Sequence, residues 1–315
     1  MALQPDPLSP QAQAILDAPD QPRLTGELTA ERAVAIRESQ AASRRITVDA
    51  VAAELGLSAT WVEAAGVRVV ELHAAPERRA PTGTGHALYL HGGGFTSGLA
   101  HDMTSVLMAD RLGVPVVSVD YAYAPEEVFP VAIDQATEVY RALTAQRGGP
   151  WVAFGVSAGA NLALGMVQRL RAAGDSVPLA LGLFTPWADL TGNGDSRAAN
   201  DGRDPVLRWP EQLPHAAGAY AGATPLDDPL VSPIYAAYDA EFPPSIITTG
   251  TRDLFLSDCT RLYWRLRRAG ARAELRVWEN LWHAFNTQHA VPEAAEARRE
   301  VAEFLLAALG ASVTP

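Results

Sequence analysis

The chain has 315 residues, 48% of them hydrophobic and 19% charged, and its formal net charge at pH 7 is −11. This is the composition of a globular protein, long enough for one large α/β domain or two small ones. The negative charge argues against nucleic acid or an anionic membrane surface as a partner, because both would repel the protein. The sequence also has no apolar run of about 18 residues and no signal-peptide pattern, which predicts a cytoplasmic protein without a membrane span.

The predicted elements begin with residues 29–56, where apolar side chains recur at helical spacing and predict one or two amphipathic helices. From Val67 onward, short β-rich runs alternate with longer helical runs. The predicted strands are Val67–Leu72, Ala87–Leu90, Val114–Val119, Trp151–Val156, Leu179–Phe184, Ser245–Thr249 and Ala273–Trp278. The predicted helices cover about 102–112, 130–146, 158–173, 257–269 and 292–309. This alternation favours an α/β fold with a mostly parallel sheet covered on both faces by helices.

Residues 186–244 interrupt the alternation. They contain no clear strand and are rich in Pro, Gly, Asp and aromatic residues. A segment this long inside a compact domain is usually a lid or a binding element, although a surface excursion without function is the alternative. We expect residues 186–244 and the helices of residues 1–56 to form a cap, and residues 57–185 and 245–315 to form the core.

A glycine-rich motif, His91-Gly92-Gly93-Gly94-Phe95, follows the predicted strand Ala87–Leu90. Three consecutive glycines leave backbone N–H groups uncovered, so that they can point at a ligand oxygen. An oxyanion hole needs such donors, already directed at the charge that develops in a tetrahedral intermediate. The alternative is a flexible loop at the exit of a strand, with His91 ordering the loop through hydrogen bonds.

A second motif, Gly155-Val156-Ser157-Ala158-Gly159, follows an apolar run and opens a helical run. A serine between small residues at a strand-to-helix turn is held in a strained backbone and exposed as a nucleophile. The glycines are needed because larger side chains two positions away would collide in so tight a turn. The pentapeptide occurs by chance in glycine-rich chains, but its place after a strand and downstream of the first motif makes coincidence unlikely to explain both.

A serine nucleophile needs a base, and the base needs an orienting acid. In enzymes built around such a turn the chain order is serine, acid, histidine, each after a later strand. Asp253 follows the predicted strand Ser245–Thr249, and His283 follows Ala273–Trp278. Both therefore stand where this order requires an acid and a base.

Three alternatives stay open. Among the seven histidines, His289 also follows the candidate acid, although it lies further along the chain than His283. Asp258 competes with Asp253, but it falls within the next predicted helix, where Arg261 or the helix N-terminus would hold it. Cys259, the single cysteine, has no strand-to-helix turn around it, which favours a packing role. One cysteine also excludes an intramolecular disulfide and a metal site built from cysteines.

Together these motifs resemble those of the hormone-sensitive-lipase-like (family IV) carboxylesterases of the α/β-hydrolase superfamily, over roughly residues 65–290. The resemblance rests on the two glycine motifs, on Asp253, on His283-Ala284-Phe285 and on the segment 120–126, which reads DYAYAPE. Two departures affect the expected site. The family usually has aspartate where Val156 stands, and Arg-Leu where this chain has Ala122-Tyr123.

The resemblance implies an α/β-hydrolase fold with a helical cap and no metal or organic cofactor. It implies that Ser157 attacks the acyl carbon, that His283 moves the proton and that Asp253 orients the imidazole. The expected oxyanion-hole donors are the backbone N–H groups of Gly93, Gly94 and Ala158. The expected substrate-binding residues are Phe95, Tyr123, Val156, Trp187 and Trp209.

The expected activity is hydrolysis of short- or medium-chain carboxylic esters through an acyl-enzyme intermediate. A lactonase is the second interpretation, because segment 185–196 resembles that of ε-lactone hydrolases and two tryptophans would wall a short pocket. A non-catalytic binding protein with this fold is the third, although all three expected catalytic residues are present. Family members often form homodimers through the last strand, which here is Ala273–Trp278.

Overall fold

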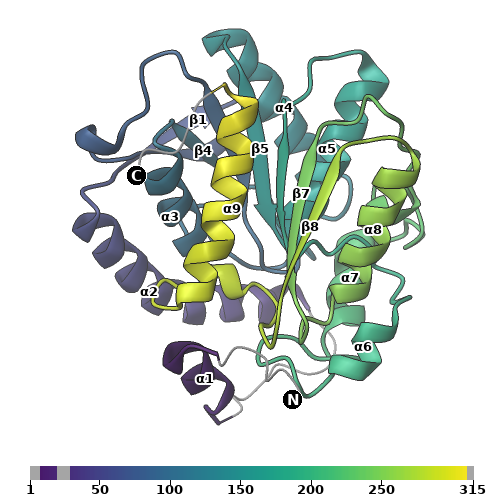
Figure 1. Ribbon diagram of the computed structural model, residues 1–315. Coiled ribbons are helices and arrows are strands. Elements are labelled where there is room, and N and C mark those ends of the chain that lie inside the picture. Colours follow the sequence, from purple (N-terminus) through teal and green to yellow (C-terminus); the bar gives the residue numbers. More distant parts are fainter. Residues whose placement is uncertain (1–7, 20–28, 311–315) are drawn as a thin grey trace, which may run out of the picture.

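The computed structural model describes residues 8–19 and 29–310, and its centre is one twisted sheet (Figure 1). The strand order is β1-β2-β4-β3-β5-β6-β7-β8. β1 and β2 pair antiparallel, as do β2 and β4, whereas all pairs from β4 to β8 are parallel. The strands are β1 Ser58–Ala64, β2 Val67–His73, β3 His86–Leu90, β4 Val116–Val119, β5 Trp151–Val156, β6 Leu181–Phe184, β7 Ser245–Gly250 and β8 Ala273–Trp278.

Nine α-helices lie in the described part of the chain. They are α1 Pro10–Leu16, α2 Ala30–Glu54, α3 Met103–Leu112, α4 Val131–Arg147, α5 Ala158–Ala173, α6 Asp195–Asn200, α7 Leu213–Ala221, α8 Leu256–Arg268 and α9 Pro292–Ala308. Short 3-10 turns cover Pro76–Arg78, Pro233–Tyr235 and Phe285–Thr287. The predicted mostly parallel sheet with alternating helices is confirmed, and the predicted helical region 29–56 is one long helix.

β1 is a strand that the sequence did not predict. Six of its seven positions are exposed, so it lacks the alternation of apolar and polar residues that marks a half-buried strand. It forms as one arm of a hairpin with β2, in which Ala64 pairs with Val67. Between them, Ala65 and Gly66 both have positive φ, as a two-residue turn that matches the twist of a hairpin requires.

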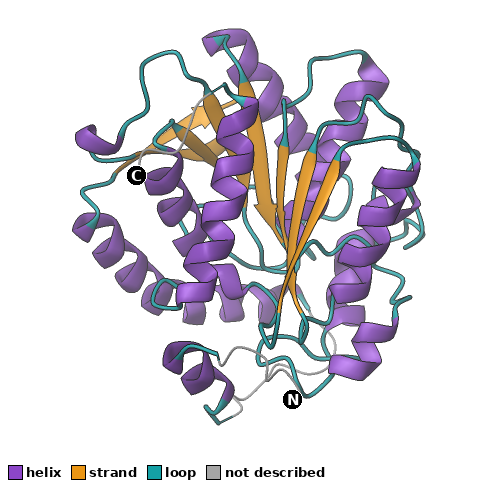
Figure 2. Cartoon of the chain, viewed as in Figure 1, coloured by secondary structure: helices purple, strands orange, loops and turns teal. Residues whose placement is uncertain are grey.

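Two layers of helices cover the sheet (Figure 2). Helices α4, α5 and α8 pack on one face, where their side chains form a core with residues such as Leu88 and Leu183. Helices α3 and α9 and the end of α2 pack on the other face, against residues such as Tyr89 and Phe154. β4, β5 and β6 between these layers are buried along their whole length and apolar except for Ser118, as expected for a sheet covered on both sides.

The loops at the carboxyl ends of the parallel strands gather at the lower end of the molecule in Figure 2. The insertion between β6 and β7, residues 185–244, lies at this end and carries α6 and α7. Helix α1 also docks there, on the loop after β8 and on the start of α9, where Ser9 donates two hydrogen bonds of 2.7 Å to Glu293. No helix of the described residues is long and apolar enough to cross a membrane.

Candidate active site

Ser157 sits in a tight turn between β5 and α5, with φ of +56° and ψ of −117°. The turn is held by hydrogen bonds from Ser157 N to Phe184 O at 2.9 Å and from Trp187 N to Ser157 O at 3.2 Å. Its glycines are required for packing. A Cβ at Gly159 would overlap the carbonyl oxygen of Leu90, and one at Gly155 would overlap the backbone of Gly159. Only glycine therefore lets α5 start so close to β3.

His283 joins Ser157 to Asp253 through both nitrogens of its ring. Nε2 lies 2.9 Å from Ser157 Oγ, and Nδ1 lies 3.1 Å from Asp253 Oδ1. The three residues stand on the loops after β8, β5 and β7, and all three side chains are buried. A hydroxyl, an imidazole and a carboxylate in this order form a chain in which the imidazole can accept the hydroxyl proton while the carboxylate holds the ring.

Asp253 is fixed by two further hydrogen bonds. Thr249 Oγ1 donates to its Oδ2 at 2.9 Å, and the backbone N–H of Phe255 donates to its Oδ1 at 2.8 Å. The Phe255 ring then packs edge-on against the imidazole of His283, with 4.8 Å between the ring centroids. These contacts leave the carboxylate and the imidazole little freedom to rotate.

The glycine loop lies beside the elbow. Gly93 has φ of +122° and Gly94 has φ of +63°, values that favour glycine at both positions. Within the described chain, the N–H groups of Gly93, Gly94 and Ala158 donate to no backbone carbonyl. Ala158 is the first residue of α5, so its N–H belongs to the uncommitted donors at a helix N-terminus.

His91 orders the glycine loop from inside. Its Nδ1 lies 2.8 Å from Gly92 O, and its ring stacks on Tyr121 with 4.1 Å between centroids. The Tyr121 hydroxyl donates to His91 O at 2.6 Å. Burial lowers the pKa of His91 to about 4, so the ring is neutral at pH 7. His91 therefore supports the loop, and the imidazole that hydrogen-bonds to Ser157 is that of His283.

Two of the expected substrate-binding residues belong to one aromatic cluster next to His283. Trp187 stacks on Phe255, with 5.3 Å between centroids, and Phe255 contacts the imidazole. Phe95 lies 5.7 Å from Trp187 and stacks on Tyr220 of α7 at 3.7 Å. The structure thus brings an aromatic wall, formed by the glycine loop and the insertion, up to the Ser–His pair.

The contacts of the other three expected substrate-binding residues are with other parts of the structure. The Tyr123 hydroxyl donates to Gly98 O at 3.2 Å. Val156 is buried in the core on the face of α3 and α9. Trp209 packs against Gly192 and lies 5.4 Å from the guanidinium of Arg197. In the described part of the structure no hydrogen bond or ring contact joins Tyr123, Val156 or Trp209 to His283.

Comparison with known proteins identifies the family. A model of the alpha/beta hydrolase fold matches residues 87–287. An acetyl-hydrolase of Streptomyces hygroscopicus is 32% identical over 228 residues, covering 71% of this chain and 76% of that protein. The structure of the esterase E25 superposes with a TM-score of 0.88 at 30% identity, covering 98% of this chain and 96% of that one. An esterase from the bacterial hormone-sensitive lipase family superposes with a TM-score of 0.76 at 28% identity, covering 89% and 98%.

The chain belongs to the hormone-sensitive-lipase-like (family IV) carboxylesterases of the α/β-hydrolase superfamily. The resemblance inferred from the sequence is thereby confirmed, and the protein is a carboxylic ester hydrolase. The interpretation as a non-catalytic binding protein is set aside.

The rival residues of this carboxylesterase lie elsewhere. His289 is exposed on the surface. Cys259 is buried within α8, and burial raises the pKa of its thiol, which disfavours the reactive thiolate. Asp258 is buried as well, but its hydrogen bonds are in a polar network with Asp189 and Arg197, whereas Nδ1 of His283 lies against Asp253.

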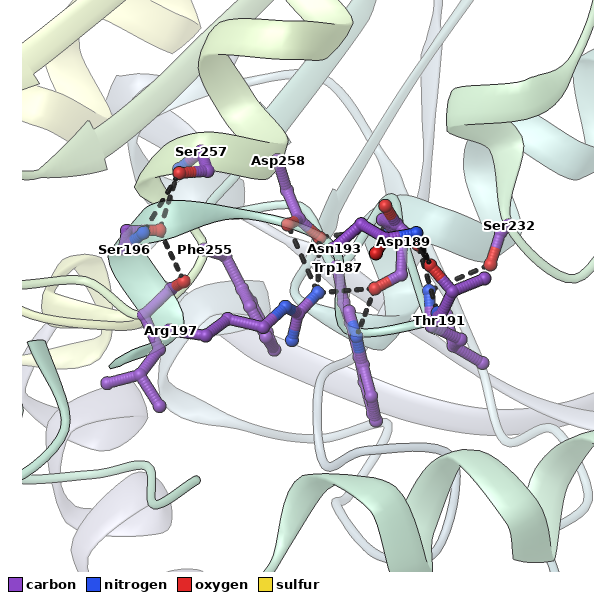
Figure 3. Close-up of polar contacts among 12 residues, drawn as sticks. Trp187, Asp189, Thr191, Asn193, Ser196, Arg197, Ser232, Phe255, Ser257 and Asp258 are labelled. Carbon is purple, nitrogen blue, oxygen red and sulfur yellow. Dashed lines mark hydrogen bonds and ion pairs between the residues drawn. The ribbon is translucent and has the colours of Figure 1, made fainter. Parts of the chain in front are cut away.

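That network corrects the expected partner of Asp258 (Figure 3). Asp258 pairs with Arg197 of the insertion, with Nη2 3.0 Å from Oδ2, and accepts a hydrogen bond of 2.9 Å from Asp189 N. Of the two expected partners, Arg261 instead binds the Asp189 carboxylate at 2.6 Å, whereas the helix N-terminus is close, because Asp258 lies in the first turn of α8. The sequence spacing within one helix favoured Arg261, whereas the fold brings Arg197 from a distant segment into closer contact.

Sequence reasoning did not assign a role to three polar residues that the insertion places against the acid loop. Ser196, Asn200 and Asp204 are all buried and all hydrogen-bond to residues between Thr251 and His283. Their only signal in the sequence is that polar side chains gather in a loop-like segment, which by itself is typical of exposed turns. Their contacts depend on how the insertion folds back over the sheet.

Proposed function

We propose that this carboxylesterase hydrolyses short- and medium-chain esters by a serine mechanism with an acyl-enzyme intermediate. The observation that supports the proposal best is the hydrogen-bonded chain from Ser157 through His283 to Asp253, with distances of 2.9 Å and 3.1 Å. The serine oxygen is held toward the imidazole by a backbone conformation that the surrounding fold enforces.

In the first half-reaction, Ser157 Oγ attacks the acyl carbon and its proton moves to His283 Nε2. Asp253 accepts the hydrogen bond from Nδ1–H and stabilises the imidazolium. The tetrahedral intermediate then expels the alcohol, which takes the proton from His283. In the second half-reaction, a water molecule gives a proton to His283 Nε2 and its oxygen attacks the acyl carbon. As this second tetrahedral intermediate collapses, His283 returns the proton to Ser157 Oγ and the carboxylic acid leaves.

The negative oxygen of each tetrahedral intermediate would be bound by the N–H groups of Gly93, Gly94 and Ala158. Each such donor contributes about 3 kcal/mol of transition-state stabilisation in comparable sites. Their lack of backbone acceptors in the described structure leaves these groups available for that charge.

The insertion 186–244 and the N-terminal residues up to 56 would form the cap over this site, and residues 57–185 and 245–315 the core. Arg37 of α2 supports this division, because its guanidinium reaches over Tyr123 to pair with Glu126 and to donate to Thr96 O at 3.0 Å. Helix α2 thus contacts the residue that follows the glycine motif. Phe95 and Trp187 would then form the wall of the substrate pocket nearest to His283.

One panel of substrates measures both the preferred acyl chain length and the activity on cyclic esters. We expect the purified enzyme to turn over p-nitrophenyl acetate and butyrate faster than long-chain esters, in keeping with an acetyl-hydrolase among its relatives. The panel also contains ε-caprolactone as the alternative substrate, because the compact aromatic wall around Trp187 would suit a small ring. A higher kcat/KM for the lactone than for every linear ester would make lactone opening the main activity.

Ser157→Ala tests the serine mechanism. The variant should lose nearly all turnover of p-nitrophenyl acetate, whereas Ser39→Ala, at an exposed position of α2, should match the wild type. Rapid mixing should also show a burst of p-nitrophenol in the wild type if the acyl-enzyme accumulates. Wild-type activity in Ser157→Ala would overturn the proposal.

A further inference from the structure

The insertion between β6 and β7 is hydrogen-bonded directly to the loop that carries Asp253. The Ser196 hydroxyl donates to Leu254 O at 2.7 Å. The Asn200 side chain donates to Thr251 O at 3.0 Å and to Asp253 O at 2.9 Å. Short helix α6 therefore contacts the backbone carbonyls on both sides of the acid, and it does so from a segment about fifty residues away in the chain.

Asp204, just beyond α6, contacts the same loop through backbone N–H groups. Its Oδ2 accepts hydrogen bonds from His283 N at 3.1 Å and from Leu254 N at 3.4 Å. One carboxylate oxygen thus joins the backbone of the histidine to that of the residue after Asp253. The other oxygen accepts from Val206 N at 2.7 Å and from Leu207 N at 3.2 Å, which fixes the carboxylate in its own segment.

We infer that Asp204 is a positioning residue of the esterase, which holds the acid loop and the histidine loop in register so that His283 can bridge Asp253 and Ser157. The inference rests on the proposed function. Asp204 itself contacts neither the serine nor the expected position of a substrate. It acts because a shift of even 1 Å in a catalytic geometry can cost about 10²-fold in rate.

The surroundings of Asp204 give this role a pH signature. Burial, and after it the nearby charge of Asp253, raise the pKa of its carboxyl to about 6, while His283 and the N–H bonds of its own turn oppose the rise. The titratable and charged groups that face it are Asp253 and His283 on the two catalytic loops and, in its own segment, Arg208, which donates to Asp204 O. Above about pH 6 the carboxylate is charged and accepts its N–H bonds at full strength, and below this pH it is protonated and accepts them more weakly.

The experiment compares kcat and KM for p-nitrophenyl butyrate from pH 5 to 8 in the wild type, Asp204→Asn, Asn200→Ala and Asp227→Asn. Asp227 is an exposed acid of the same insertion and serves as the matched control. Asp204→Asn should lower kcat about 10²-fold at pH 8, because the two catalytic loops shift relative to each other. KM should change little, because the residues that bind the substrate are unaffected. The gap to the wild type should narrow below about pH 6, where the wild-type carboxyl is protonated. Asn200→Ala should lower kcat by a factor that does not depend on pH, because no titrating group is removed.

Two further measurements are made on each variant. Thermal unfolding reports whether the protein is folded, and the downfield NMR signal of the imidazole proton between His283 and Asp253 reports the geometry of that pair. In Asp204→Asn that signal should broaden or shift while the protein stays folded. A wild-type kcat and profile in Asp204→Asn, or a loss that follows only the unfolded fraction at every pH, would overturn the inference. If Asp204→Asn does not fold, a wild-type kcat in Asn200→Ala has the same consequence. Full activity in Ser157→Ala would instead overturn the proposed function, so the two failures are distinguishable.

Discussion

Ser157 holds a backbone conformation that non-glycine residues avoid, with φ of +56°. Strained residues of this kind cost about 1–3 kcal/mol and persist only where the surrounding structure enforces them. Here the hydrogen bonds from Ser157 N to Phe184 O and from Trp187 N to Ser157 O enforce it. The fold therefore spends stability to keep the serine oxygen directed at His283 before any substrate arrives.

Replacing the histidine tests its role against that of its nearest rival. His283→Ala should lower kcat by roughly 10⁴- to 10⁶-fold, because among the residues that the structure describes only His283 hydrogen-bonds to Ser157 Oγ. His289→Ala, at an exposed position, should keep wild-type kinetics. Both variants should keep the wild-type thermal unfolding midpoint within a few degrees. A mild loss in His283→Ala together with a large loss in His289→Ala would identify His289 as the base.

Replacing Asp253 and replacing Asp258 by asparagine should have different effects, the first on activity and the second on stability. Asp253→Asn should lower kcat about 10⁴-fold, because an amide does not hold the imidazole in the required tautomer. Asp258→Asn should instead lower the free energy of unfolding by about 3 kcal/mol, because Arg197 is buried and loses its carboxylate partner. Nε and Nη1 of Arg197 have no hydrogen-bond partner within the described chain, so Asp258 is its main compensation. Steady-state kinetics and urea unfolding of both variants measure the two effects, and an active Asp253→Asn would contradict the first.

At the scale of elements, the first turn of α5 determines how closely the elbow approaches the glycine loop. Gly159 lies against the carbonyl oxygens of Leu90 and His91, whereas Gly165, further along the same helix, faces the flexible side chain of Ile133. A backbone neighbour cannot move aside as a side chain can. The two glycines thus have different reasons to be small.

Gly159→Ala should therefore be strongly destabilising, by roughly 3 kcal/mol or more, since overpacking against backbone displaces α5 from β3. Gly165→Ala is the matched control. There the greater helix propensity of alanine, about 1 kcal/mol, offsets the small movement required of Ile133, and stability should change little. Urea unfolding compares the two, and equal stabilities would show that the close approach of α5 to β3 is dispensable.

The elements that the sequence predicted are those whose signals are local. The buried strand Trp151–Val156 is apolar throughout, and the glycines around Ser157 report a tight turn that their own residues define. The exposed strand β1 has no such signal, because only its pairing with β2 makes it a strand. For the same reason Asp253 and His283 could be found from chain order, whereas Asp204 could not. Its partners are set by how the insertion folds back, and that is a long-range property.

At the scale of the whole molecule, the sheet ends in two edge strands, β1 and β8, and β8 is the one that continues its parallel part. Within the described structure β8 pairs with β7 alone, so its outer backbone groups face no strand. Charges of opposite sign follow one another on one face of this edge, with Glu274 and Arg276 in β8 and Arg272 directly before it. Two copies of such a strand can pair antiparallel about a two-fold axis, because Glu274 then lies opposite Arg276 of the partner subunit.

We expect a homodimer through β8, centred on Leu275. Glu274→Arg should shift the protein toward monomer, because arginines would then face each other across the axis. Adding Arg276→Glu to that variant should restore the dimer, because opposite charges face each other again. Sedimentation at several protein concentrations measures the mass. A wild-type monomer, or a dimer that neither substitution weakens, would contradict the expected interface.

The contacts of α6 with the acid loop have a consequence for protein engineering. One way to change the substrate range of such an enzyme is to build a chimera in which the segment between β6 and β7 is exchanged for that of a relative. Here such a graft would also remove Ser196 and Asn200, which hold the backbone around Asp253. A chimera that retains residues 195–204 and exchanges only the remainder would vary the pocket while preserving the support of the acid. One part of the insertion, residues 195–204, therefore has to be kept with the core, and only the rest of the insertion can be exchanged.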